Sequence, residues 1–308
     1  MTSPYMSVVI PSLEEDQKKL CVMIDRIVSD RSVLEVIVVD DYSSAPLCLP
    51  NAKVVRNSSR LGSSKSREIG IAQASGSVIL TTDAHVRFKS ADWGSKIVEA
   101  VTSEPQNVFC PVCIPSGNCS FRGKLYGGNI DVMTTRNGRA AILETNWNES
   151  LSKDGIIGCV MGGAYAFSSA WHRKIGGYGG IKGWCPTEMA AISLKTRLAG
   201  GSCIVLGVEM EHEFRTKPPF QFSKTQTVYN KLRLASVIFP PGIATMVPTL
   251  LSGTDGLMDA LYENMADFKD IVAERDRFWR ECESNPKEAA AMAGIEFEID
   301  KLVRKTAG

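Results

Sequence analysis

The chain has 308 residues, of which 44% are hydrophobic and 22% charged, and this composition excludes a disordered protein. Lysine and arginine number 35 and aspartate and glutamate 34, so a formal net charge of +1 excludes binding to nucleic acid or an anionic membrane through overall charge alone. Nine scattered cysteines are an odd number in a chain of this length, and they favour a reducing compartment over a disulfide framework.

No targeting or membrane-spanning segment is apparent in the sequence. Residues 1–11 lack the basic region and the apolar region of a secretory signal. The least polar stretch, 234–251, is interrupted by Pro240, Pro241 and Pro248, which would break the backbone hydrogen bonds of a spanning helix. We therefore expect a soluble, cytoplasmic protein without a transmembrane segment.

Strand-like and helix-like segments alternate in the first part of the chain. Runs of β-branched residues predict strands, and apolar residues at helical spacing predict helices. The predicted strands are 7–10, 33–39, 53–56 and 77–82, and the predicted helices are 13–28 and 63–74. This alternation favours an open, mostly parallel α/β sheet, in which ligands bind beyond the carboxyl ends of the strands. Asp41 and Asp83 follow two of these strands and are candidate ligand-binding residues.

Further along the chain the pattern first loosens and then becomes helical. The predicted elements are short strands between 109 and 148, a strand at 158–168, a helix at 187–198 and a strand at 202–208. Gly162 and Gly163 would let the backbone of the second of these strands approach another group closely. Past Pro218, apolar residues recur at i, i+3 and i+4, notably from Leu257 to Val272, and predict a mostly helical region.

The strongest local motif is Thr81-Thr82-Asp83-Ala84-His85, at the end of a buried strand. In an extended chain Asp83 and His85 would point the same way, and a carboxylate with an imidazole suits Mn²⁺ better than Mg²⁺. His212 follows another predicted strand, in an acidic segment with a nearby arginine that fits a metal and phosphate site. The alternative is an aspartate that caps a turn beside a surface histidine. The third histidine, His172, is predicted to be a surface residue.

A loop that enters a predicted helix carries Arg60, Lys65 and Arg67. Cationic side chains and the amides of a helix N-terminus both suit a diphosphate. The segment is neither a Walker loop nor a Gly-x-Gly-x-x-Gly fingerprint, so nucleotide hydrolysis and dinucleotide binding lose support. The alternative is that these residues are solvated charges at the start of the helix.

Taken in order, these motifs resemble those of glycosyltransferases with the GT-A fold. More narrowly, the chain is similar to the polypeptide N-acetylgalactosaminyltransferases and to the family 2 glycosyltransferases. The blocks that carry the resemblance are Ser7 to Ile10, Val38 to Ser44, Arg60 to Gly62 with Arg67, Asp83 to His85, Met161 to Gly201, and His212 to Arg215. The resemblance implies a Rossmann-like, mostly parallel GT-A domain over residues 1–220, followed by a helical extension over 221–308.

The resemblance also implies a role for individual residues. The implied ligands of Mn²⁺, or of another divalent cation, are Asp83, His85 and His212. The implied contacts of a UDP-sugar donor are Asp41, Arg60, Arg67, Asp83, Gly162, Gly163, Trp184 and Arg215. The implied catalytic residues are Glu188, Asp83 and His85, with Glu188 at the sugar or the acceptor hydroxyl. A metal and arginines would stabilise the charge that develops on the departing UDP.

The activity that the resemblance implies is transfer of a hexose or N-acetylhexosamine from a UDP-sugar to a hydroxyl, by preference Ser or Thr of a protein. Met189 stands where the family has Asn or Asp after the glutamate, and Ala191 where it has a second acid, so the base of an inverting reaction does not transfer to Met189. Either Glu188 serves as that base, or the reaction retains configuration and the donor phosphate takes the acceptor proton. The Asp83-x-His85 motif with His212 resembles the retaining relatives and favours retention. A polysaccharide or a modified DNA base, the latter disfavoured by the neutral charge balance, remains an alternative acceptor. A catalytically inactive sugar-nucleotide-binding protein is the alternative function.

Two other features have simpler explanations than a second site. Cys110, Cys113 and Cys119 lack a fourth ligand at zinc-ribbon spacing and are expected to pack as small hydrophobic residues. The basic segment 224–233 is expected to form a helix packed on the catalytic domain, with an interfacial or acceptor-binding helix as the alternative. The carboxyl-terminal helices are also the place where a homodimer would form.

Overall fold

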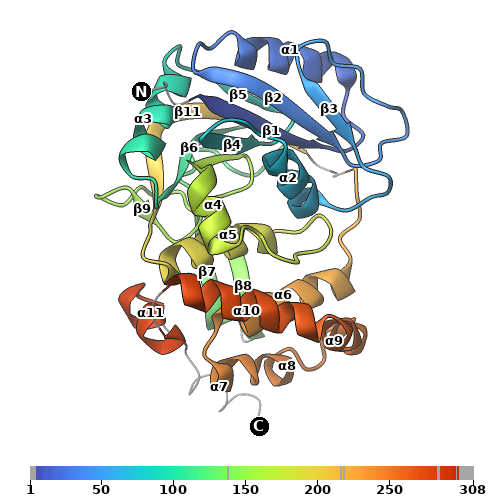
Figure 1. The fold of residues 1–308 in the computed structure, drawn as a ribbon, viewed down its shortest axis with the longest axis vertical. Coiled ribbons are helices and arrows are strands. Elements are labelled where there is room, and N and C mark those ends of the chain that lie inside the picture. Colours follow the sequence, from blue (N-terminus) through green and yellow to red (C-terminus); the bar gives the residue numbers. More distant parts are fainter. Residues whose placement is uncertain are drawn as a thin grey trace.

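The computed structural model describes residues 5–295 and 297, apart from 137, 138, 216, 218, 283 and 284. Within this part of the chain, nine strands form one mixed sheet in the order β3-β2-β1-β4-β10-β6-β11-β5, with β9 paired to β11. Figure 1 shows helices on both faces of the sheet and further helices at the bottom of the view, at the end of the molecule away from the sheet. The predicted α/β architecture is therefore confirmed.

The amino-terminal part of the sheet is parallel. Its elements are β1 (Met6–Ser12), α1 (Gln17–Val28), β2 (Val33–Asp40), β3 (Lys53–Arg56), α2 (Ser63–Ala72) and β4 (Val78–Thr82). Val9 of β1 lies between Ile37 and Thr81, so the carboxyl ends of β2 and β4 meet at one edge of the sheet. The elements predicted for this segment are confirmed, although α1 begins only at Gln17, after the side chain of Asp16 caps it.

The rest of the sheet contains antiparallel pairs. Its elements are β5 (Val86–Phe88), α3 (Trp93–Ser103), β6 (Val108–Gly117), β9 (Ile156–Ile157), β10 (Ala164–Ser168) and β11 (Cys203–Phe214). A separate hairpin is formed by β7 (Gly128–Arg136) and β8 (Arg139–Trp147). The strand predicted at 158–168 starts only at Ala164, and Gly162 and Gly163 precede it. The strand predicted at 202–208 continues to Phe214 past an irregularity between Leu206 and Glu209, so His212 lies within a strand rather than after one.

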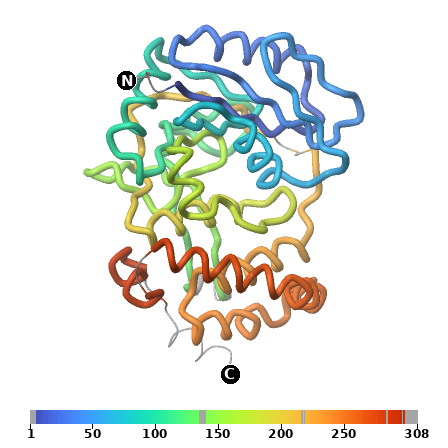
Figure 2. The backbone as a smooth tube through the Cα atoms, viewed as in Figure 1, coloured from blue at the N-terminus to red at the C-terminus, as the bar shows by residue number. Residues whose placement is uncertain are grey.

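The remaining elements are helices. They are α4 (Ser169–Ile175), α5 (Thr187–Leu198), α6 (Lys224–Ile238), α7 (Pro241–Ala244), α8 (Val247–Leu250), α9 (Leu257–Ala266), α10 (Phe268–Cys282) and α11 (Pro286–Met292). Figure 2 shows α6 to α11, in orange and red, at the opposite end of the molecule from α1. The predicted helical region is confirmed over the described residues, whereas 298–308 lie outside them. None of the helices described is both long and apolar enough to cross a membrane.

The two faces of the sheet are covered by different hydrophobic clusters. Side chains of a strand alternate between faces, so Val8 packs with Leu20 of α1 and Ile97 of α3, while Val9 belongs to the cluster on the other side. That second cluster is continuous from the sheet through α4 and α5 to Tyr229 of α6 and Phe278 of α10. The carboxyl-terminal helices therefore share a hydrophobic core with the sheet.

A buried ionic cluster also joins the helical region to the sheet side. Glu274 of α10 lies between two cations, with Lys195 Nζ 2.8 Å from its Oε1 and Arg233 Nη2 2.7 Å from its Oε2. Burial raises the pKa of the Glu274 carboxyl, but Lys195 and Arg233 outweigh this and hold that pKa below its ordinary value. We call these three residues the junction cluster.

His172 differs from the prediction of a surface residue. Its side chain in α4 is buried, stacks on Phe167 with ring centroids 5.0 Å apart, and lies with Nε2 3.4 Å from Glu68 Oε1. These contacts come from a strand and a helix that the local sequence around His172 does not reveal. The prediction was therefore wrong, because tertiary packing rather than local polarity decides the burial of this residue.

Candidate functional site

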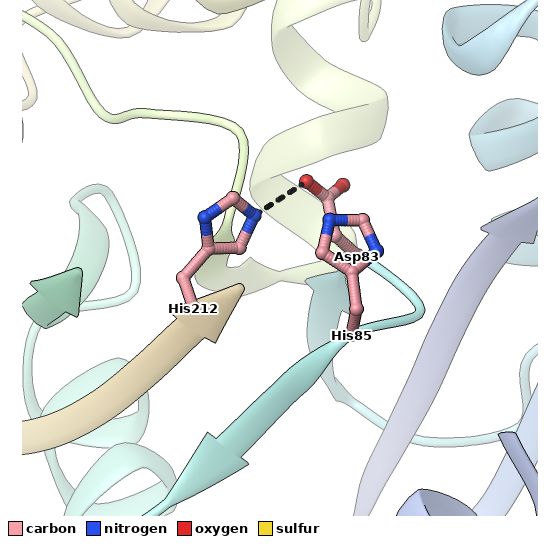
Figure 3. A group of neighbouring side chains, drawn as sticks. All are labelled: Asp83, His85 and His212. Atoms are coloured by element: carbon pink, nitrogen blue, oxygen red, sulfur yellow. Dashed lines mark hydrogen bonds and ion pairs between the residues drawn. The ribbon is translucent and has the colours of Figure 1, made fainter. Parts of the chain in front are cut away.

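Asp83, His85 and His212 converge at the edge of the sheet where β4 ends (Figure 3). Asp83 and His85 lie in the turn from β4 to β5, and His212 of β11 pairs with Val86 of β5. One possible ligand atom from each residue lies within 4.8 Å of the others, and His212 Nε2 is 3.3 Å from Asp83 Oδ2. Asp83 and His85 are thus brought together by a turn rather than by the extended chain expected from the sequence, and His212 joins them through a long-range strand pairing.

This group of side chains fits a divalent cation. A carboxylate and two imidazoles form the donor set that suits Mn²⁺ and similar metals. The Nδ1 atoms of His85 and His212 are buried and have no hydrogen-bond partner among the described residues. Burial raises the pKa of Asp83, but the hydrogen bond from His212 and the charge of Arg67 outweigh it, so this pKa lies below its ordinary value. Asp83 is therefore ionised at neutral pH and available as a ligand.

Arg67 of α2 holds two carboxylates of the site in place. Its Nη2 donates to Asp83 Oδ1 at 3.0 Å, its Nη1 donates to Glu188 Oε1, and its Nε donates to Thr81 Oγ1 at 2.9 Å. Burial opposes the charged form of Arg67, but Glu188 and other neighbours raise the pKa of the guanidinium above its ordinary value. With its side chain almost fully buried and these donors engaged, Arg67 is an anchor for Asp83 and Glu188.

Glu188 lies in the first turn of α5, and both oxygens of its carboxylate accept hydrogen bonds. Its Oε2 accepts hydrogen bonds from the hydroxyls of Ser63 and Ser64, each at 2.7 Å, and its Oε1 accepts from Arg67. These donors come from the first two turns of α2, so Glu188 ties α5 to α2 directly beneath the site. Glu188 therefore holds these two elements together.

A cavity of about 380 Å³ adjoins the metal-ligand group. The predicted site residues that line it are Arg67, Asp83, His85, Gly162, Gly163, Trp184, Glu188, His212 and Arg215. Its apolar wall is formed by side chains of the β7–β8 hairpin, of α5 and of the segment before α6, including Trp147, Met189, Phe220 and Phe222. Gly163 has its predicted close approach, since a Cβ there would lie 3.3 Å from the His212 ring.

Asp41 and Arg60, by contrast, do not line this cavity. The fully buried carboxylate of Asp41 accepts hydrogen bonds from the amides of Leu61 and Gly62 at 2.7 and 2.9 Å, and from Trp184 Nε1 at 2.8 Å. A fourth donor, Asn57 Nδ2, lies 2.9 Å from Oδ1. Arg60 is half-exposed and pairs with Glu14 at 2.9 Å. Asp41 therefore anchors the loop that enters α2, and Arg60 lies outside the cavity.

One acidic residue of the site was missed in the sequence. Glu15 lines the cavity between His85 and Arg215, and Arg215 Nη2 donates to its Oε2. A signal existed, because the acidic run Glu14-Glu15-Asp16 begins two residues after the end of β1, at the same edge of the sheet as Asp41 and Asp83. A run of charged residues is also typical of solvated surface, so the burial of Glu15 is not apparent from the sequence.

The sheet topology and the site define a protein of the GT-A class. The model of the family Glycosyl transferase family 2 matches residues 7–167, which is more than half of the chain, so this chain belongs to that family. The predicted family and fold are thereby confirmed.

Relatives among known proteins are distant. Human polypeptide N-acetylgalactosaminyltransferase 14 is 27% identical over 215 residues, which are 62% of this chain and 36% of that protein. The mouse protein named inactive polypeptide N-acetylgalactosaminyltransferase-like protein 5 is 22% identical over 233 residues, 66% of this chain and 51% of that protein. The matched region thus covers only 36% of the length of the human protein.

A solved structure supports the fold. The crystal structure of GalNAc-T7 with UDP, GalNAc and Mn²⁺ superposes with a TM-score of 0.67 at 18% identity. The match covers 98% of this chain and 57% of that chain. At this identity the likeness establishes a common fold, which includes the carboxyl-terminal helices of the present chain.

Proposed function

We propose that this chain is a divalent-metal-dependent glycosyltransferase that transfers a hexose or N-acetylhexosamine from a UDP-sugar to a Ser or Thr hydroxyl of a protein, with retention of configuration. The observation that carries this proposal is the convergence of Asp83, His85 and His212 beside a cavity of about 380 Å³. The similarity to polypeptide N-acetylgalactosaminyltransferases supports both the donor class and a protein acceptor.

Several residues are suited to hold the donor. Asp83, His85 and His212 would bind the cation, which when bound supplies positive charge for the diphosphate. Arg215 at the rim of the cavity carries a guanidinium suited to phosphate oxygens. Trp184 stacks on Phe220 with ring centroids 5.0 Å apart, and this aromatic surface excludes water from one side of the cavity.

Retention of configuration is supported by the hydrogen bonds that the carboxylates around the cavity accept. Glu188 accepts three hydrogen bonds, Asp83 is engaged by Arg67 and His212, and Glu15 is engaged by Arg215. Each carboxylate among the described lining residues thus has a partner, the oxygen of Glu15 that Arg215 does not engage faces His85, and Met189 supplies no carboxylate. In the proposed reaction the bond from the anomeric carbon to the phosphate oxygen breaks with its electron pair on UDP. The acceptor oxygen bonds to the same face of that carbon and passes its proton to the phosphate.

The test is an assay of UDP release from a panel of UDP-sugars with Mn²⁺ and a peptide rich in Ser and Thr. We expect UDP release with one or more donors, a hexose or N-acetylhexosamine mass increment on the peptide, and an NMR coupling constant that shows the donor's anomeric configuration. Binding of UDP without any release would instead favour an inactive sugar-nucleotide-binding protein. Release with sugar on a polysaccharide or a modified DNA base but on no peptide would overturn the protein acceptor.

The cellular location and the oligomeric state stay predictions. A cytoplasmic location is supported by the nine cysteines, which are all free thiols. Cys110 and Cys113 are buried, as expected of small hydrophobic residues, whereas Cys119 is only half-buried. A homodimer through the carboxyl-terminal helices would be measured by the molecular mass in solution.

A further inference from the structure

The two ring nitrogens of His85 have different surroundings. Nδ1 is buried, lacks a hydrogen-bond partner among the described residues, and lies 3.8 Å from Glu15 Oε1. The two nitrogens lie on opposite sides of the ring in Figure 3, where one faces the side of Asp83 and His212 and the other faces away. Nε2 is therefore the nitrogen presented to the candidate metal position.

A neutral imidazole carries one proton, which sits on either nitrogen. Only the form with the proton on Nδ1 leaves the Nε2 lone pair of His85 free for a cation. The protein must therefore stabilise one of the two tautomers if His85 is to act as a ligand, and an acceptor near Nδ1 is the means by which metal sites commonly do this.

Glu15 is placed to be that acceptor. Its side chain is only 10% exposed, and the oxygen facing His85 is not the one that accepts from Arg215. A carboxylate oxygen that is not engaged by Arg215 thus faces a ring nitrogen that has no hydrogen-bond partner among the described residues.

We propose that Glu15 is a positioning residue of the metal site, whose Oε1 accepts the Nδ1 proton of His85 while its Oε2 holds Arg215 at the rim of the cavity. The inference rests on the metal site of the proposed function. Shortening the 3.8 Å separation by about 1 Å would give an ordinary hydrogen bond. One side chain, at the junction of β1 and α1, would then set both a metal ligand and a cation for the diphosphate.

The first test compares Mn²⁺ dissociation constants, measured by electron paramagnetic resonance on the full chain without nucleotide. We expect Glu15→Ala to bind Mn²⁺ about 10- to 100-fold more weakly than the unaltered chain, as is typical when the partner of a ligating histidine is lost. Glu15→Gln keeps the shape and one acceptor oxygen, so its loss should be smaller. Asp16→Asn removes the neighbouring charge, keeps a helix-capping side chain, and should stay within about twofold.

The second test reads the tautomer of His85 in metal-free protein from its imidazole ¹⁵N chemical shifts. We expect Nδ1 protonated and Nε2 unprotonated in the unaltered chain, with a large fraction of the proton moved to Nε2 in Glu15→Ala, or in Glu15→Gln should the alanine variant not fold. An unchanged tautomer, or Mn²⁺ affinity within twofold in Glu15→Ala, would overturn the proposal. If the unaltered chain binds no Mn²⁺, the metal part of the proposed function fails, while the tautomer still decides the role of Glu15.

Discussion

Two buried ionic clusters of this chain differ in their ratio of acidic to basic side chains. In the junction cluster, Glu274 is flanked by Lys195 and Arg233, so two cations surround one acid. At the site, Asp83, Glu188 and Glu15 outnumber Arg67 and Arg215, and two imidazoles lie beside Asp83.

Under the proposed function, the junction cluster stabilises the fold, whereas the site binds a ligand. An excess of cations around Glu274 repels a metal and leaves its carboxylate fully satisfied. An excess of acid together with imidazole lone pairs attracts a metal. The junction cluster should therefore contribute to stability and the site to binding and rate, and the following variants test that division.

The largest effect is expected from Asp83→Asn, which removes the charged metal ligand. The loss of several kcal/mol of charge stabilisation corresponds to about a 1000-fold drop in kcat/KM for UDP release. The measurement is steady-state UDP release, normalised to folded protein by circular dichroism because the ion pair with Arg67 is also lost. Asp276→Asn, on the exposed side of α10, is the matched control and should change the rate by less than twofold.

Glu274→Gln should show the reverse behaviour. Removing the acid leaves Lys195 and Arg233 buried without their partner, which should lower the free energy of unfolding by about 3 kcal/mol at pH 7. The measurement is urea denaturation, and kcat/KM per folded molecule should be unchanged. A large loss of rate with intact stability would contradict the division between the two clusters.

The same pair of proteins makes a pH prediction. The pKa of Glu274 is lowered from 4.5 in the folded chain, so its ionised form contributes stability above pH 4.5, and that contribution is lost as pH falls through the folded pKa. The stability difference between the unaltered chain and Glu274→Gln should therefore be full at pH 7 and shrink below pH 4.5. A difference that is constant over this range would show that the charge of Glu274 is not what matters.

Trp184→Phe should have a smaller effect. It keeps an aromatic ring against Phe220 but removes one of four hydrogen bonds to Asp41, at a cost of about 1 kcal/mol in the free energy of unfolding. Urea denaturation and UDP affinity distinguish the two roles of Trp184. Unchanged stability with at least tenfold weaker UDP binding would mean that Trp184 and Asp41 serve the donor rather than the loop.

The smallest effect is expected from Arg60→Ala. Its half-exposed ion pair with Glu14 should contribute about 0.5 kcal/mol or less to stability. UDP affinity, measured by calorimetry, should change by less than twofold because Arg60 does not line the cavity. A tenfold loss of affinity would return Arg60 to the donor site.

The parallel half of the sheet could be predicted closely from the sequence, and the middle of the chain could not. β2 is covered on both faces, so its sequence is a continuous apolar run that ends at Asp40. β6 instead contains Pro111 and Pro115, residues that argue against a central strand, and it was predicted only as short pieces. The β7–β8 hairpin carries many polar residues, forms a two-stranded sheet of its own and packs Met133 and Ile142 into the core, an arrangement that local hydrophobicity does not reveal.

The candidate site shows the same limit. Asp83 and His85 form a local motif. His212 lies 129 residues after Asp83, and the pairing of β5 with β11 brings it to them. Asp41 and Arg67 have the expected residue types, but their side chains form hydrogen bonds with other residues of the protein. Glu15 was missed because burial of one member of an acidic run depends on distant partners, here His85 and Arg215.

The most direct test of the metal site is calorimetric titration of UDP into the unaltered chain and into His212→Ala, each with Mn²⁺ and after chelation. We expect chelation to weaken UDP binding by the unaltered chain at least tenfold, and Mn²⁺ to give little or no enhancement in His212→Ala. UDP affinity that is the same with and without Mn²⁺, or a full Mn²⁺ enhancement in His212→Ala, would contradict a metal-dependent site built from Asp83, His85 and His212.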